Sequence, residues 1–153
     1  MALRLRILAI GTRMPDWVQG GFGEYRKRLP RECALELREL ALSRRAGHQA
    51  VTEEGQSLLA ALQPEEQAIA LEVSGEAWST EDLAAHLRRW RDEDQRVAFL
   101  IGGPDGLSQA CRARATRHWS LSSLTLPHPL VRIVLIEQLY RAWTILGGHP
   151  YHR

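Results

Sequence analysis

The last seven residues of the chain, GGHPYHR, bring together side chains that can do chemistry. Behind two glycines, Gly147 and Gly148, come two imidazoles, a phenol at Tyr151 and a guanidinium at Arg153. Imidazoles titrate near neutral pH, a phenol donates hydrogen bonds, and a guanidinium binds anions. The segment is therefore either an active-site tail that hinges at the glycines or an ordinary frayed chain end.

A glycine pair follows the apolar run RVAFLI, in the sequence IGGPDGLS at residues 101–108. Gly102 and Gly103 would let a ligand approach bare backbone, and a side chain at Gly102 is expected to fill that space. Ser108 would open a helix whose amide groups face the same loop. The spacing matches neither GxGxxG nor the P-loop, so it does not indicate either of those nucleotide-binding classes. A tight turn at PDG without a ligand is the alternative.

A third stretch, SLSSLTLPHP at residues 120–129, alternates leucines with hydroxyl residues. An apolar wall with hydroxyls and free backbone groups suits a flat heteroaromatic ring such as adenine. An ordinary edge strand is the alternative. His128 lies between Pro127 and Pro129, next to this run, and is either a further candidate catalytic residue or a structural histidine in a turn.

Two other kinds of site are not indicated. The histidines at positions 118, 128, 149 and 152 have neither HxxxH nor HxH spacing, and the chain contains no CxxC pair, so we expect no metal site. A serine hydrolase is poorly supported because GxSxG is absent.

The elements that must position these stretches alternate between strand and helix. Strands are expected at 3–10, 35–42, 67–73 and 96–101, with a strand or extended loop at 118–126. Helices are expected to begin with Asp16 as N-cap, at about residue 51, at Ser79 or Thr80, at Ser108 and at Leu130. This order predicts one α/β domain, 1–153, with a parallel sheet covered by helices. Ligands of such sheets bind beyond the carboxyl ends of the strands, at the loops 72–78, 102–108 and 121–129.

The last predicted helix, Leu130–Leu146, is apolar over most of its circumference. Glu137, Arg141 and Thr144 form one narrow polar stripe. One sheet face cannot cover such a wide apolar arc, so the pattern favours a homodimer.

Composition limits the classes of protein further. The chain has 153 residues, 44% hydrophobic and 25% charged, with a net charge of +2. Lys27 is the only lysine among 20 basic residues, which suits phosphate and base contacts but also follows from GC-rich coding. The two cysteines, the lack of a signal peptide and the lack of a membrane-spanning run predict a soluble protein of the cytoplasm.

Taken together, IGGPDGLS, WSLSSLTLPHPLVRIVLIEQLYRAW and HPYHR resemble the SPOUT-class methyltransferases that modify large-subunit ribosomal RNA at N3 of a pseudouridine. The opening ILAIGTRMPDWVQGGFGEYRKRLP resembles the same family, so the similarity runs from about residue 5 to residue 153. One departure is Glu76, which stands in LEVSGEA where the family has a lysine.

The resemblance implies a SPOUT fold with a C-terminal trefoil knot, a homodimer, and S-adenosylmethionine bound in a bent shape. The implied substrate is large-subunit rRNA in the assembled ribosome. The family's cofactor positions correspond to Leu71, to Gly102 and to a run in the loop after the last strand. That run comprises Leu121, Ser122, Ser123, Leu124, Thr125 and Leu126.

The implied methyl transfer needs no metal, but a proton must leave N3 of the base. For that step we expect His152 and Tyr151 to act on the ring, without deciding which is the base. Arg153 and Arg141 are expected to hold phosphate or a uracil carbonyl, with Arg153 as the RNA contact. The competing hypothesis is a noncatalytic ribosome-binding module on the same scaffold, which would not need S-adenosylmethionine.

Overall fold

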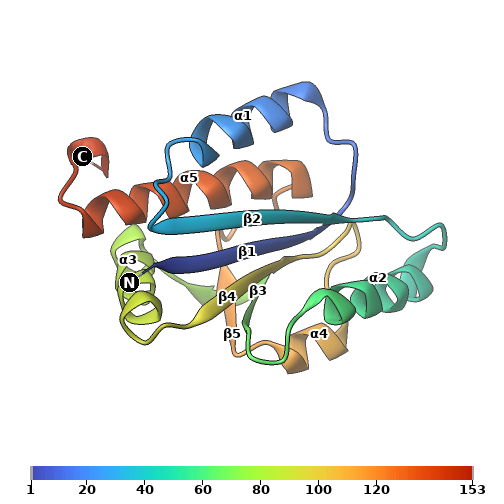
Figure 1. The fold of residues 1–153 in the computed structure, drawn as a ribbon. Coiled ribbons are helices and arrows are strands. Elements are labelled where there is room, and N and C mark those ends of the chain that lie inside the picture. Colours follow the sequence, from blue (N-terminus) through green and yellow to red (C-terminus); the bar gives the residue numbers. More distant parts are fainter. Residues whose placement is uncertain (1, 153) are drawn as a thin grey trace.

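A computed structural model describes residues 2–152 as five parallel strands in the order β2-β1-β4-β3-β5 (Figure 1). The strands are β1 (Leu3–Ile10), β2 (Cys33–Leu40), β3 (Gln67–Ala77), β4 (Arg96–Ile101) and β5 (Arg117–Ser120). The helices are α1 (Asp16–Arg26), α2 (Gly47–Ala61), α3 (Thr80–Asp92), α4 (Gln109–Arg114) and α5 (His128–Leu146). A 3₁₀ turn, η1 (Pro150–His152), follows α5. The expected α/β class is confirmed.

Helices cover both faces of the sheet because the strands bury side chains on both faces. From β1, Leu5 and Ile7 enter the core shared with α1, α3 and α5, whereas Leu8 and Ile10 enter the core shared with α2 and α4. The two cores are separate clusters of buried residues. Figure 1 shows α1, α3 and α5 on one side of the sheet and α2 and α4 on the other.

Several predicted boundaries differ from the structure. Strands β1 and β4 have the expected bounds, but β3 extends to Ala77 and β5 ends at Ser120, so the rest of 118–126 is a loop. Ser79 caps α3 as expected, with a reciprocal bond to Asp82. Asp16 is not an N-cap: Pro15 holds that position, and Asp16 is the first helical residue. A proline at this position holds the extended conformation of a cap, but its side chain has no acceptor for the free N–H groups of the first turn, so no side-chain cap is formed.

Helix α5 runs from the carboxyl edge of the sheet to the opposite edge (Figure 1). Its 19 residues, at ~1.5 Å each, separate its two ends by about 28 Å. The C-terminal tail therefore begins at the edge where the sheet strands start, away from the loops that follow the strands. Among residues 2–152, no helix is long and apolar enough to cross a membrane.

Candidate active site

The carboxyl ends of β3, β4 and β5 open into one cavity of about 860 Å³. Its walls come from a segment inside β3, Leu71 to Ser74, where the pairing of β3 with β5 shifts register, from the loop after Ile101, and from the loop from Leu121 to His128. The first turn of α5 adds Val131. The volume lies within the ~300–1,000 Å³ that is typical of small-molecule sites. Segments far apart in the sequence thus meet where the sequence predicted a ligand.

The glycine loop after β4 is a closed turn. Gly106 donates from its backbone N–H to the carbonyl of Gly103 at 3.0 Å and has a positive φ of 87°. A Cβ on Gly102 would lie 2.7 Å from the carbonyl carbon of Gly106, not in the ligand space. The expectation that a side chain at Gly102 fills the cavity is therefore wrong. The glycine is required because the chain folds back onto it.

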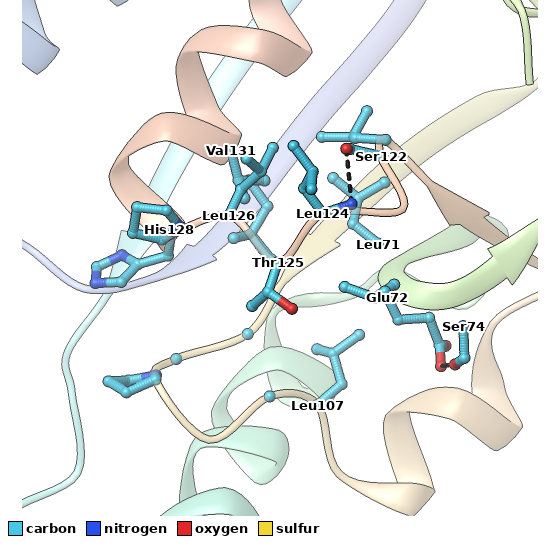
Figure 2. Close-up of a pocket in the computed structure, with 18 of the residues that line it drawn as sticks. Leu71, Glu72, Ser74, Leu107, Ser122, Leu124, Thr125, Leu126, His128 and Val131 are labelled. Carbon is cyan, nitrogen blue, oxygen red and sulfur yellow. Dashed lines mark hydrogen bonds between the residues drawn. The ribbon is translucent and has the colours of Figure 1, made fainter. Parts of the chain in front are cut away.

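The loop after β5 forms the apolar wall, as its leucines predict. Leu121, Leu124 and Leu126 line the cavity, together with Ser122 and Thr125 (Figure 2). The Ser122 hydroxyl accepts a hydrogen bond from the Leu124 backbone N–H at 2.9 Å, so it stabilises the loop. Ser123 is exposed and does not line the cavity.

Sequence reasoning missed an ionic cluster at the other side of the cavity. Glu72 lines the cavity, and its carboxylate lies 2.7 Å from His118 Nδ1 and 3.3 Å from Arg112 Nε. Ser74 donates a hydrogen bond to the same carboxylate at 3.0 Å. Burial opposes ionisation of Glu72, but the bonds from His118 and Ser74 and the charge of Arg112 outweigh it and lower its pKa. Glu72 follows Leu71 directly, so the strand-end rule could have found it.

His128 lies across the cavity from Glu72 (Figure 2). Its Nδ1 is buried and has no hydrogen-bond partner within residues 2–152. Burial and the charge of Arg132 lower the pKa of His128, against the smaller influence of Glu54, so the imidazole is neutral at pH 7.

Arg132 fixes the base of this region. It is a charged residue on a mostly apolar helix, and the structure buries it to 1% exposure. Its guanidinium donates to the carbonyl of Gly11 at 2.7 Å and pairs with Glu39. The positive φ of Gly11, 117°, lets the chain turn there, and a Cβ would lie 3.2 Å from the His128 ring. Arg132 thus joins the start of α5 to the ends of β1 and β2.

The residues predicted to act on the substrate lie at the other end of α5. Arg141 and Tyr151 both bond the Glu137 carboxylate, at 2.7 and 3.0 Å, and Arg141 also lies over the Tyr151 ring. Tyr151 packs edge-on against Tyr140, so the tail is folded onto the helix. Burial and the neighbouring Tyr25 and Glu137 raise the pKa of Tyr151 to about 12.

His152 lies with Tyr151 in η1, and its Nδ1 is buried without a partner within residues 2–152. Arg153 lies outside the described residues. Within one chain, the structure therefore does not bring His152, Tyr151 or Arg141 to the cavity that His128 lines. Residues 2–152 contain no group of three metal-ligating side chains.

Comparison with known proteins gives full-length matches. Residues 3–152 match the sequence model of a family described as "Predicted SPOUT methyltransferase". The chain is 54% identical to the ribosomal RNA large subunit methyltransferase H of Hahella chejuensis, over 99% of each protein. It is 55% identical to the protein of the same name from Chromohalobacter salexigens, over 99% of this chain and all of the relative.

Solved structures share the fold at low sequence identity. A probable methyltransferase from Bordetella pertussis Tohama I superposes with a TM-score of 0.60 at 20% identity, over 92% of this chain and 94% of that one. A probable methylase family protein from Haemophilus influenzae gives 0.60 at 12% identity, over 100% and 72%.

Proposed function

The chain belongs to the SPOUT methyltransferase family, and on that premise we propose that it methylates N3 of a pseudouridine in large-subunit ribosomal RNA, with S-adenosylmethionine as donor. The full-length relatives are named for methylation of the large-subunit RNA. The observation that carries the proposal is the convergence of three distant segments on one cavity. All but one of the residues expected to hold the donor line that cavity.

The residues of the cavity fit a nucleoside with a charged tail. Leu71 and the leucines of 121–126 offer flat apolar contact for adenine, and the free backbone groups of that loop can bond its edge. Glu72 offers a carboxylate to hydroxyl or ammonium groups.

We further propose that the C-terminal segment is threaded as a trefoil knot, one of the rare exceptions to unknotted topology. The path of the chain supports this. The loop after β5 returns beside the loops after β3 and β4, and α5 then crosses to the face that α1 and α3 cover.

When bound, S-adenosylmethionine supplies a methyl group on a positively charged sulfur, which N3 of the base takes up as N3 loses its proton. The protein must receive that proton and stabilise the negative charge that develops on the ring. Tyr151, with a pKa of about 12, stays protonated at neutral pH and acts as a donor. His152 is therefore our candidate for the base, and Arg141 and Arg153 for contacts to a carbonyl or phosphate.

We propose that a second copy of the chain brings this tail to the cavity. A helix of about 28 Å separates tail and cavity within one chain, which is too far for a proton transfer. Helix α5 also leaves apolar side chains half-buried along its length, among them Ile133, Trp143 and Ile145. A homodimer would cover these and complete each site with the partner's tail. Sedimentation at micromolar concentration should give a dimer, and a monomer would contradict this arrangement.

Two measurements test the function. Mass spectrometry of large-subunit rRNA should find a methylpseudouridine in cells that contain the gene product and not in cells that lack it. Calorimetry should show that the protein binds S-adenosylmethionine without added metal. Donor binding without any change in the RNA would contradict the substrate, and no donor binding would favour the noncatalytic module. A ribosomal substrate places the protein in the cytoplasm.

A further inference from the structure

The exposed large apolar side chains of residues 2–152 gather at one edge of the sheet. Two line the donor cavity, Val73 and Leu124, and three lie on neighbouring segments: Trp17, Leu42 and Leu130. Trp17 is in the first turn of α1, Leu42 follows β2, and Leu130 is in the first turn of α5. Helices α1 and α5 and the loop after β2 all begin at the carboxyl edge of the sheet (Figure 1), so these residues lie at the same edge as the cavity.

Exposed arginines occupy the same edge. Arg13 lies in the loop between β1 and α1, and Arg44 and Arg45 lie in the loop between β2 and α2. Among residues 2–152, no carboxylate forms an ion pair with Arg13 or Arg44. Arg45 pairs with Glu53 at 3.3 Å, but both side chains are more than half exposed, so the pair is weak.

Hydrogen bonds fix the backbone of both loops. Gly11 is held by Arg132 and by the carbonyl of Leu40, and the carbonyl of Met14 accepts from Gln19 at 2.7 Å. Between these anchors, Arg13 has a φ of 57°, a conformation that a non-glycine residue adopts only where its surroundings impose it. In the second loop, the Ser43 N–H donates to the buried carboxylate of Glu54 at 2.9 Å. The arginines are thus presented by ordered backbone.

We propose that Arg13, Arg44, Arg45 and Trp17 form a docking surface, called here the arginine rim, for the RNA that surrounds the target base. The proposal rests on the methyltransferase function proposed above. Arginines neutralise phosphates, and an exposed indole offers a face on which an unpaired base stacks. Nucleotides next to a base that enters the cavity would contact both the arginines and the indole at this edge.

RNA fits this surface better than a second copy of the chain does. In a two-fold dimer residues of one copy contact different residues of the other, and the partner's tail that the proposal above brings to this edge has no acidic side chain to pair with the rim. Adjacent arginines at 44 and 45 instead suit a polyanion, which supplies phosphates to both.

The test compares two variants that each lose three positive charges. One carries Arg13→Asn, Arg44→Gln and Arg45→Gln; asparagine tolerates the positive φ at position 13. The control carries Arg31→Gln, Arg88→Gln and Arg96→Gln, which are exposed and lie away from the carboxyl edge. Co-sedimentation with ribosomes from a strain that lacks the modification gives the affinity as a function of salt, and calorimetry gives the donor affinity.

The rim variant should bind ribosomes about 10–100-fold more weakly at 0.1 M salt, and its log–log salt slope should fall by about two, at ~0.7–0.9 per phosphate contact. Its donor affinity and its dimer should match wild type, and the control should bind ribosomes like wild type. Trp17→Ala should weaken binding about tenfold at every salt concentration, whereas Trp17→Phe should retain most of it.

Three results would overturn the proposal. A rim variant that binds ribosomes as tightly as wild type would show that the rim does not contact RNA. An equal loss of affinity in the control would show that binding depends on net charge and not on this surface. A rim variant that loses the dimer would show that a second copy covers it. If wild-type protein itself neither binds nor methylates ribosomes, the proposed function fails. If wild-type protein is active and the rim variant binds equally well, only the arginine rim is refuted.

Discussion

The two ends of helix α5 differ in what they complete. At its first turn, His128 and Val131 join three segments around a cavity that is formed by one chain. Toward its C-terminal end, Tyr151 and Arg141 converge on Glu137, and none of these three residues lines the donor cavity. The N-terminal end of α5 therefore belongs to a binding site that lacks the reactive groups of the tail. The C-terminal end carries those reactive groups outside the binding site.

This difference indicates that donor binding and proton transfer depend on different ends of α5. Backbone turns and ion pairs such as that of the buried Arg132 with Glu39 preorganise the cavity. The donor can therefore bind without a rearrangement of the chain. The tail is held by side-chain contacts to Glu137 and Tyr140, which can exchange for contacts to RNA. Changes at the two ends should therefore separate donor binding from methyl transfer.

The largest separation should come from deleting Tyr151 to Arg153. Methylation of ribosomes in single-turnover assays should fall about 10²–10⁴-fold, the usual loss for a positioned acid–base group. Donor affinity by calorimetry should stay within a factor of about three, because the cavity is formed by one chain without residues of its tail. A truncated enzyme that methylates at the full rate would return GGHPYHR to an ordinary chain end.

The converse separation should come from Gly102→Val. A Cβ would lie 2.7 Å from the Gly106 backbone, so the turn that shapes the cavity must move. We expect donor affinity to fall by about 10²-fold, the loss of one or two well-placed contacts. Gly23→Val is the matched control, because no atom lies within 4 Å of a Cβ at that position. Unchanged donor affinity of the Gly102→Val variant would show that the donor binds at another site.

Within the tail, His152→Ala and Tyr151→Phe should differ. The alanine variant loses the candidate base, and its single-turnover rate should fall about 10²-fold. The phenylalanine variant loses a hydrogen bond to Glu137 but no base, because the pKa of Tyr151 is about 12. Its rate should fall by less than about tenfold. Equal losses would assign the proton transfer to the phenol.

The smallest effect concerns His128 and pH. Its folded pKa lies below the unfolded value of about 6.5, so the unfolded chain binds the proton more readily. Wild type should therefore lose stability as pH falls through about 6.5, and His128→Asn should lack that contribution. Urea denaturation at pH 7.5 and pH 5.5 should show the variant gaining relative to wild type at the lower pH. A constant difference would mean that His128 is not held neutral at the cavity.

Sequence reasoning located most of the cavity because it depends on local rules. Strand ends, glycine turns and an alternating leucine run are visible in a single sequence, and they predicted the loops 102–108 and 121–129, whereas Leu71 was named only through the family resemblance. Glu72 and Arg132 were missed because their partners, His118, Arg112 and Glu39, are far away in the sequence. Glu66 is likewise buried, against Arg6, which lies far away in the sequence.

The path of the tail was the least predictable part. Gly147 and Gly148 indicated a hinge, and Gly148 does have a positive φ of 69°. The composition of the tail could not show that Tyr151 would fold onto Glu137 and Tyr140, since that depends on the face of α5 that the last turn exposes.

Mixing two inactive variants tests the central claim, that each site combines the cavity of one chain with the tail of another. Gly102→Val lacks the cavity and the chain truncated after Pro150 lacks the tail, so each alone should be inactive. After exchange of subunits at equal concentrations, a symmetric dimer that shares its tails should recover about a quarter of the wild-type sites. If each chain used its own tail, no active site could form, and absence of recovery in verified mixed dimers would contradict the account.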